Sequence, residues 1–508
     1  MENFLMLFNG FQVALTFNNL LACLFGAALG IVMGATPGIG AMAGVALLLP
    51  LTWAFDPTTA IIMLGTLYFS NMYGSAFSAI LLNIPGDSPA IMTAMDGYPM
   101  ATRKGRPGQA LFTSNLSSFI GGTMGILLLT FAGPGLARVG LRFGPAEMTS
   151  LLLMAMTSVG WLVGDSPIKG ISVTLMGILI ATMGMDTLSG VPRYHFNNIH
   201  LLGGIPFVPF VIGAVGFAQV IKMMEARTIT TSQAVKAKLT IRGSLLSKDE
   251  VKRIVPAASR AGLVGIFVGI LPGAGATAGA FLGYAAQKGF KSKEPLGTGA
   301  VEGIAASESA NSAAAAGSFA PMLALGIPGS GTTAVLLGGL IMWGLSPGPL
   351  LFTQAPDFAW GLIASLYLAN IATLIFAVLC VPFLIKILSA PIKLIIPVIT
   401  VVCFMGAYTS TNSMFGVLVM LISGIAGYML DKYKYPIAPM LLAYVLAPML
   451  EDNMRRALII SDGSLSIFFT RPISLGFLLV FFGLVLFPLT KLVFNKIRVR
   501  IRENDQTK

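Results

Sequence analysis

Two seven-residue stretches place proline and glycine inside apolar sequence, where a continuous helix should contain neither. They are Gly34-Ala-Thr-Pro-Gly-Ile-Gly40 and Gly269-Ile-Leu-Pro-Gly-Ala-Gly275. Proline lacks an amide proton and clashes with the preceding turn, and glycine costs a helix about 1 kcal/mol relative to alanine. A helix that restarts after such a break presents unpaired N–H groups and about half a positive charge. Such a helix start binds anions, so the breaks are the first candidates for chemistry.

Two further breaks carry a shared Ile-Pro-Gly sequence. They are Asn83-Ile-Pro-Gly86 and Gly326-Ile-Pro-Gly329, and in each the Pro-Gly lies eleven residues after a Gly-Ser pair. The first break continues with Asp87, Ser88 and a proline, which is the pattern of a helix N-cap with proline at the opening position. The second continues with Ser330, which can also cap a helix. We therefore expect helices to restart at all four breaks.

The breaks recur in a duplicated order along the chain. Glycines 30, 34, 38, 40 and 44 match glycines 265, 269, 273, 275 and 279 at a numbering difference of 235, and the Ile-Pro-Gly breaks match at 243. This pattern predicts an internal repeat in which a hairpin turn is followed by a longer, broken helix. The glycine ladders at every fourth position allow two helix backbones to approach closely.

Convergence of the four restarts in the membrane would create an anion site without buried lysine or arginine, which are costly there. The substrate-binding residues predicted on this basis are Gly38, Ile39, Gly40, Asn83, Gly86, Ser88, Gly273, Ala274, Gly275, Thr277, Gly329, Ser330, Gly331 and Thr332. Oxygen donors at and near the breaks are predicted to bind a coupling cation, Na⁺ or H⁺: Thr36, Asp87, Asn311 and Ser318. No resident metal and no organic cofactor is expected.

Alternative interpretations remain open for these residues. Each break can be a structural kink whose glycines serve only close helix packing. Asp87, as an N-cap, would compete with a bound anion, so it would instead ligate a cation or carry a proton. Asn311 and Ser318 can equally form helix–helix hydrogen bonds worth about 1 kcal/mol. Glu308 lies twenty residues before Pro328, about 30 Å along a straight helix, which predicts a place at the membrane edge or in an aqueous vestibule.

The composition defines the setting of these motifs. Apolar residues make up 55% of the 508, charged residues 10%, and the mean hydropathy is +0.84. These values indicate a polytopic membrane protein. The net charge of +12 is explained by basic residues in cytoplasmic loops, so no nucleic-acid partner is expected. Cys23, Cys380 and Cys403 lie in apolar stretches and indicate core positions, not disulfides or metal ligands.

The expected architecture is an all-α polytopic membrane protein with two inverted repeats, re-entrant hairpins and broken transmembrane helices. Each arm of the second hairpin, about 16 residues long, would reach about 24 Å, short of a bilayer core of about 30 Å. Basic residues flank the second hairpin, whereas Glu2 and Asp56 flank the first, so the two would enter from opposite sides. The predicted divisions are 1–107 (repeat 1), 108–224 (scaffold helices), 225–253 (cytoplasmic linker), 254–350 (repeat 2), 351–495 (scaffold helices) and 496–508 (cytoplasmic tail).

Three motif groups together resemble one family. They are the two Gly-x-x-Pro-Gly-x-Gly stretches, Tyr73-Gly-Ser with Ile80-Leu-Leu-Asn-Ile-Pro-Gly86, and Glu308-Ser-Ala-Asn311 with Leu325-Gly-Ile-Pro-Gly-Ser330. The set resembles the large membrane subunit of bacterial tripartite tricarboxylate transporters over nearly the full length. Where that family tends to carry a second asparagine, this chain has Ser312.

The resemblance implies partners and an energy source that the residues themselves do not show. It implies a small membrane subunit of the same transporter, a periplasmic solute-binding protein that delivers a di- or tricarboxylate, and a place in the bacterial inner membrane. It further implies an ion gradient, usually of Na⁺, in place of ATP. The function predicted is therefore carboxylate import by a secondary transporter subunit whose repeats move in an elevator-like or rocking manner.

Other classes of protein lack their signatures in this sequence. No intramembrane acid pair, His-Glu-x-x-His helix or Ser/His pairing of a membrane enzyme is present, so the chain is not expected to be an enzyme. The glycine-rich turns lack the Gly-Lys-Ser/Thr of a nucleotide-binding loop. An ion or solute channel, or a secondary carrier that works without a binding protein, remains the alternative.

Overall fold

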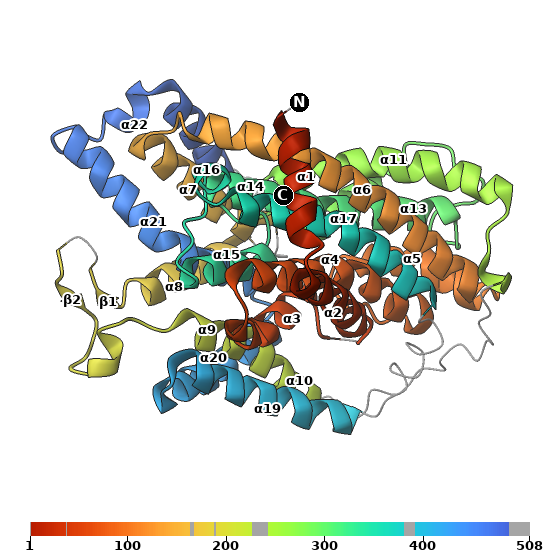
Figure 1. Cartoon of the computed structure of the whole chain (residues 1–508), viewed down its shortest axis with the longest axis horizontal. Coiled ribbons are helices and arrows are strands. Elements are labelled where there is room, and N and C mark those ends of the chain that lie inside the picture. Colours follow the sequence, from red (N-terminus) through yellow and green to blue (C-terminus); the bar gives the residue numbers. More distant parts are fainter. Residues whose placement is uncertain are drawn as a thin grey trace, which may run out of the picture.

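The fold consists almost entirely of helices. The computed structural model describes residues 2–36, 38–162, 167–186, 189–225, 242–379 and 392–486. Within them the only strands are β1 (Gly184–Met185) and β2 (Pro192–Arg193), which pair antiparallel (Figure 1). Pro37, Cys380, most of the expected linker 225–253 and the tail 496–508 lie outside the described residues.

Several described helices have the length and apolar composition of membrane spans. Six qualify: α2 (Phe17–Ala35), α6 (Pro107–Gly140), α9 to α10 (Phe207–Glu225), α11 (Lys248–Ile270), α17 (Pro356–Leu379) and α20 (Met414–Lys432). Shorter apolar helices accompany them, among them α8 (Pro167–Ala181), α15 (Gly331–Met342), α19 (Ile392–Thr411) and the helix Pro472–Leu486. The prediction of an all-α polytopic membrane protein is confirmed.

The two halves of the chain present their elements in the same order. The first half has α2, α3 (Ala41–Leu48) with the 3₁₀ turn η1 (Leu49–Ala54), α4 (Pro57–Leu82) and α5 (Ala90–Thr102). The second has α11, α12 (Gly275–Gln287), α13 (Val301–Gly317) with α14 (Phe319–Leu325), and α15. The helices are bounded by the predicted breaks because proline and glycine stand at those positions.

The glycine ladders make matching contacts in the two halves. A Cβ at Gly30 would lie 2.5 Å from the carbonyl oxygen of Leu67, and one at Gly265 would lie 2.3 Å from that of Ala310. Leu67 and Ala310 differ by 243 in number, as the Ile-Pro-Gly breaks do. Only glycine permits this approach, so the ladders hold α2 against α4 and α11 against α13 backbone to backbone.

The arms of the second hairpin are unequal, which differs from the prediction of two arms of similar, short length. In the first hairpin α2 has 19 residues, and the 8 residues of α3 continue into the 6 residues of η1. In the second α11 has 23 residues and α12 has 13. The longer arm arises because the polar start of α11 is stabilised outside the apolar stretch: Ser247 and Glu250 form a capping box there.

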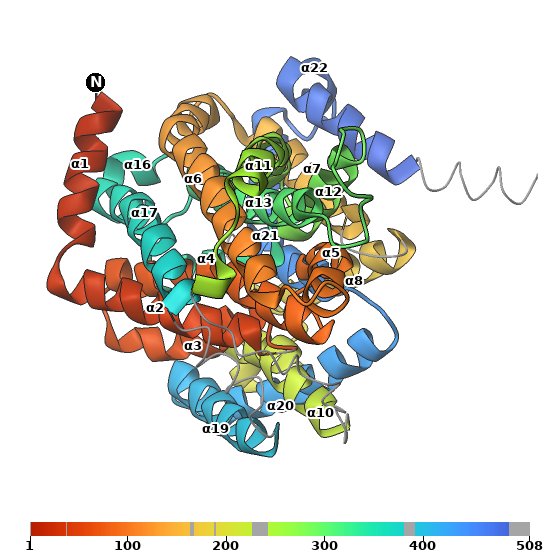
Figure 2. The ribbon, with the colours of Figure 1, turned by 90° about the vertical axis from the view of Figure 1, so that its right-hand side faces the viewer.

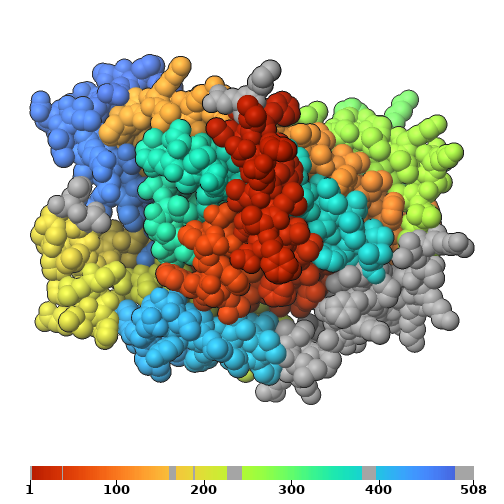
Figure 3. All heavy atoms as spheres, in the orientation of Figure 1, coloured from red at the N-terminus to blue at the C-terminus, as the bar shows by residue number. Residues whose placement is uncertain are grey.

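Helix α6 packs into the same body as the hairpins, although the sequence assigned 108–224 to a separate scaffold. A Cβ at Gly121 would lie 2.0 Å from the carbonyl oxygen of Ser309, and one at Gly125 would lie 2.7 Å from that of Ala313. Helix α17 likewise packs against α4, α2 and α6. The N-terminal helix α1 (Glu2–Ala14) lies across α17 at the surface, in red in Figure 3.

Two groups of helices flank this central body. One comprises α7 (Pro145–Leu162), α8 and α21 (Ala438–Ile460), with α22 (Ile467–Thr470) beside α7. The other comprises α9 (Phe207–Val211), the π-helical η3 (Ile212–Phe217), α10 (Ala218–Glu225), α19 and α20. Figure 2 shows α10, α19 and α20 together at the bottom, away from α7 and α22 at the top.

One buried carboxylate joins the two halves. Asp96 of α5 is fully buried and accepts hydrogen bonds from the N–H groups of Gly297, Gly299 and Ala300 at 2.8–2.9 Å. It also accepts one from the Tyr284 hydroxyl at 2.8 Å. The carboxylate therefore caps the N-terminus of α13 from the other half of the chain, where the helix dipole favours negative charge.

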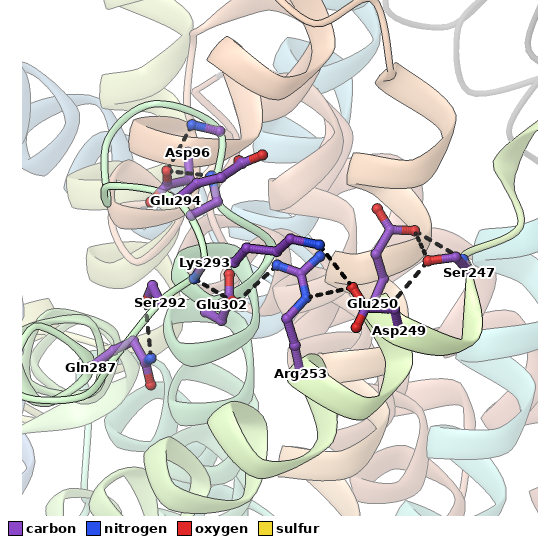
Figure 4. A network of polar contacts seen from close by, with 12 residues as sticks. Asp96, Ser247, Asp249, Glu250, Arg253, Gln287, Ser292, Lys293, Glu294 and Glu302 are labelled. Carbon is purple, nitrogen blue, oxygen red and sulfur yellow. Dashed lines mark hydrogen bonds and ion pairs between the residues drawn. The ribbon is translucent and has the colours of Figure 1, made fainter.

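A second polar network surrounds the starts of α11 and α13. Figure 4 shows Arg253 between acidic groups of both helices. Its guanidinium lies 3.0 Å from the Glu302 carboxylate and 3.4 Å from that of Asp249, and Lys293 lies 3.2 Å from Asp249. Glu302 is buried, and its ion pair with Arg253 compensates a negative charge that would otherwise be buried without a partner.

We expect Asp96→Ala to destabilise the protein strongly, because three backbone N–H groups and one hydroxyl lose their buried acceptor. The expected loss is at least about 3 kcal/mol. The exposed residue Asp357, at the start of α17, offers the control: Asp357→Ala should cost less than about 1 kcal/mol. Thermal unfolding of the purified variants compares them, and equal midpoints would show that Asp96 does not hold the halves together.

Candidate functional site

One cavity of 510 Å³ lies where the four breaks meet. Predicted residues from every break line it: Gly38, Gly40, Asp87, Ser88, Gly273, Ala274, Gly275, Thr277, Ser330, Gly331 and Thr332. The structure thus brings together segments that are separated by up to about three hundred residues. The remaining wall comes from α4, from α9 to α10 and from the connection between α20 and α21.

The two breaks of the second half are tied to one another and to a flanking helix. The Gly275 N–H donates to the carbonyl oxygen of Gly329 at 3.0 Å. The carbonyl oxygen of Pro272 accepts from the Ser158 hydroxyl of α7 at 2.8 Å. Backbone groups released inside a membrane need such partners, so α7 and the Ile-Pro-Gly break stabilise the hairpin turn.

The start of α15 is capped and connects to the first half. Ser330 accepts from the Thr333 N–H at 3.1 Å, and the Ser330 N–H donates to the Thr333 hydroxyl at 2.8 Å. The Tyr68 hydroxyl of α4 lies 3.4 Å from the Ser330 hydroxyl and 3.3 Å from that of Ser318. Tyr68 therefore links the cavity wall to the end of α13.

Asp87 does not cap its own helix as predicted. Its carboxylate reaches across to the first hairpin and accepts from the Ala41 N–H at 2.9 Å, and it also accepts from the Ser88 N–H at 2.7 Å. Helix α5 begins later, at Ala90. One carboxylate therefore already occupies the N-terminus of α3.

Four predicted substrate-binding residues do not line the cavity. Ile39 belongs to the hydrophobic core. Asn83 is exposed and ends α4 in the left-handed conformation, with φ 59°. Gly86 and Gly329 serve close packing, because a Cβ at Gly86 would lie 1.9 Å from the carbonyl oxygen of Gly34 and one at Gly329 would lie 2.7 Å from the Cβ of Ser318.

Three predicted cation ligands also lie outside the cavity. The Thr36 hydroxyl donates to the carbonyl oxygen of Val32 at 2.8 Å, and that of Ser318 donates to Ala315 at 2.7 Å. Such bonds to the preceding turn are the usual state of helical Ser and Thr in apolar surroundings. Asn311 is buried within α13, beside Glu308. Asp87 is the predicted cation ligand that lines the cavity.

The sequence analysis missed the charged side of the cavity. Lys222 and Asp431, 2.6 Å apart, line it together with Lys434 and Gln219. The basic residues fit the pattern of cytoplasmic loops, so their sequence context gave no sign of a site. A Cβ at Gly38, whose φ is +87°, would lie 2.3 Å from the Gln219 amide nitrogen. Glycine at this turn therefore brings the first hairpin against α10.

Membrane-length helices, matched helix breaks and a cavity at their meeting point define a helical membrane transporter. The chain belongs to the Tripartite tricarboxylate transporter TctA family, which matches residues 20–442. The predicted family is confirmed, and the chain is a tricarboxylate transporter subunit, not an enzyme.

Two relatives come from Agrobacterium vitis. The uncharacterized 52.8 kDa protein in the TAR-I ttuC' 3' region is 38% identical over 488 residues, which cover 96% of either chain. The uncharacterized protein in the TAR-II ttuC' 3' region is 40% identical over 228 residues, which cover 44% of this chain and 94% of that relative. No solved structure matches the chain.

Gly86→Ala should disrupt the first Ile-Pro-Gly break, because the new Cβ meets a backbone oxygen that cannot move independently. We expect a clear fall in the thermal midpoint, equivalent to about 1–3 kcal/mol as for an overpacked core. Gly135→Ala in α6 is the matched control, since no atom lies within 4 Å of its added Cβ. It should be neutral or stabilising by up to about 1 kcal/mol. A normal midpoint for Gly86→Ala would contradict the tight approach.

Proposed function

We propose that the cavity binds a di- or tricarboxylate such as citrate, and that the chain imports it. The observation that carries this proposal is the meeting of all four breaks in one cavity of 510 Å³, a volume typical of small-molecule sites. The starts of α12 and α15 supply oriented N–H groups and positive dipole ends. Thr277 and Thr332 add hydroxyl donors to the same wall.

The charges around the cavity favour a polyanion at one side. Lys222 is paired with Asp431, whereas Lys434 in the same wall adds a further positive charge. Asp87, which follows α4, is in the same wall, and its carboxylate accepts from the Ala41 N–H at the start of α3. A substrate with two or three carboxylates would place them at the start of α12, at the start of α15 and beside Lys434, away from Asp87.

The transport cycle uses an ion gradient of Na⁺ or H⁺, a small membrane subunit and a periplasmic solute-binding protein that delivers the substrate. The membrane is the bacterial inner membrane, with the C-terminus in the cytoplasm. Lys222 and Lys434 lie at helix ends that the positive-inside rule assigns to the cytoplasm. The cavity thus opens inward in this conformation.

The two repeats are inverted and move as one unit with α6 and α17 against the flanking helices. The cavity supports this division, because its wall comes from the central body and from α10 and the α20–α21 connection. Sliding or rocking of one body against the other would open and close it. A channel, or a carrier without a binding protein, is the alternative function. Flux in proteoliposomes that ignores both Na⁺ and proton gradients would favour the channel.

Lys434→Gln should raise the KM for tricarboxylate uptake about tenfold, because one charge-assisted contact is worth about 1.4 kcal/mol or more. Lys432→Gln is the control two residues away, since Lys432 pairs with Glu225 and does not line the cavity. Uptake by cells that produce the complete transporter measures both. An unchanged KM for Lys434→Gln would remove this lysine from the site.

Gly273→Val should abolish uptake while membrane insertion stays normal. Gly273 has φ 78°, which a β-branched residue adopts only with strain. The variant would displace the start of α12 from the cavity. Uptake and membrane-fraction immunoblots measure the two effects, and full uptake by this variant would contradict the role of the break.

A further inference from the structure

Glu308 is a fully buried carboxylate at the centre of the molecule, and not the vestibule residue that its distance from Pro328 predicts. Every residue of α13 is buried, and Glu308 has 0% exposure. Its two oxygens accept from the hydroxyls of Thr93 and Ser118, the latter at 2.9 Å. The Thr93 hydroxyl in turn lies 3.0 Å from that of Ser307.

The other buried acidic residues have arginine partners or several backbone N–H donors, which Glu308 lacks within the described residues. Four of them form ion pairs with arginine: Glu147 with Arg471, Asp186 with Arg455, Glu250 with Arg106 and Glu302 with Arg253. Asp96 accepts three backbone N–H bonds. Among the residues that the structure describes, no lysine, arginine or histidine pairs with Glu308. An ionised carboxylate buried without a cation is very costly.

A second observation points to an occupant at the same place. Asn311 lies one turn along α13 and beside the Glu308 carboxyl. Its side chain has 0% exposure, and apart from this approach to the Glu308 carboxyl neither its amide oxygen nor its amide nitrogen has a hydrogen-bond partner within the described part of the chain. The same holds for the hydroxyl of Ser312. Buried polar groups are normally satisfied, so the unpartnered oxygens of Asn311 and Ser312, within four residues of Glu308 on α13, are candidate ligands for a small cation.

We propose that Glu308, with Thr93, Ser118 and Asn311, binds one monovalent cation, H⁺ or Na⁺, at a site separate from the cavity. A single carboxylate among neutral oxygens compensates one positive charge. The hydroxyls can donate to an ionised carboxylate or accept from a protonated one, so they serve both states. Acidic residues buried in membrane segments commonly mark ion or proton sites.

The titratable groups on the helices around Glu308 have other partners, so none of those named below supplies a positive charge to its carboxylate. Tyr73 of α4 interacts electrostatically with Glu308, and its hydroxyl donates to the Asn370 side chain. Asp96 of α5 and Tyr284 of α12 are hydrogen-bonded to each other. Helix α6 presents Ser118, and Arg253 of α11 is paired with Glu302 and Asp249.

This inference rests on the proposed function. It gives the coupling ion a binding site, and helix α13 connects that site to the substrate cavity. Ser318 lies ten residues after Glu308, about 15 Å along the helix. Its hydroxyl contacts Tyr68, which also contacts Ser330 in the cavity wall. An occupant at Glu308 would therefore act on the substrate site through α13.

Thermal unfolding of the purified full chain tests the site without any substrate. For Na⁺, the midpoint should rise by about 3 °C or more when Na⁺ replaces choline at constant ionic strength, because a ligand that binds only the folded state stabilises it. For H⁺, the folded state holds a proton that the unfolded state releases, so the midpoint should fall as the pH rises in Na⁺-free buffer. Glu308→Gln should remove whichever dependence is present, and Glu308→Asp should retain it.

Asp357→Asn is the matched control, because it neutralises an exposed carboxylate at the start of α17. The dependence of its midpoint on Na⁺ or pH should equal that of the unmodified chain, and Asp87→Asn separately tests the carboxylate in the cavity wall. The proposal is overturned if Glu308→Gln keeps the full dependence, or if Asp87→Asn alone abolishes it, since the cation would then lie in the cavity. A lack of tricarboxylate binding would refute the proposed function and leave this result unaffected.

A measurement on the unmodified chain covers the case in which the variants do not fold. A hydrophobic carbodiimide modifies protonated carboxyls, and peptide mass spectrometry locates the product. Modification of Glu308 should decrease as the pH is raised for either occupant. At a fixed pH it should also decrease on addition of Na⁺ if Na⁺ competes with the proton, and should be unchanged by Na⁺ if only H⁺ binds. Modification that neither condition changes would overturn the proposal.

Discussion

The whole arrangement depends on one constraint: a backbone that is broken inside a membrane must find partners for the N–H and C=O groups it releases. The structure meets this constraint with contacts between distant segments. The hairpin turn of the second half bonds to the Gly329 carbonyl and to Ser158 of a flanking helix. The first hairpin bonds to the carboxylate of Asp87. Each break is stabilised by another break or by a neighbouring helix, so the breaks must lie together.

Glycine makes that convergence sterically possible. The ladders at Gly30 and Gly265 allow helix backbones to touch, and Gly86 lies against the carbonyl of Gly34. With larger residues the helices would separate, and the cavity would lose its shape. The same packing encloses α13 on all sides. Close packing therefore produces both a polar cavity and a buried carboxylate, and the two are linked through Ser318 and Tyr68.

Much of the fold was predictable because its signals are local. The apolar composition indicates a polytopic membrane protein, and the prolines and glycines mark the breaks, each of which lies between two described helices. The matched spacing of the two halves also predicted that the breaks would converge, and residues from all four line one cavity. The length of α11 was underestimated because its polar first turns are stabilised by a capping box and by Arg253. Side-chain roles were less predictable. Asn83 and Thr36 carry polar groups suited to ligand binding, but Asn83 is exposed at the end of α4 and the Thr36 hydroxyl donates to the carbonyl oxygen of Val32.

The sequence by itself determined the class of protein, the places where its helices end and the correspondence between its halves, because each rests on the chemistry of neighbouring residues. Only the tertiary structure decided which groups face the cavity. Lys222 and Lys434 enter its wall, and Asp87 reaches the first hairpin. It also decided that Glu308 meets hydroxyls of α5 and α6 and, within the described ranges, no arginine. These outcomes depend on partners some 50 to over 200 positions away, and close packing, not local preference, sets such distances.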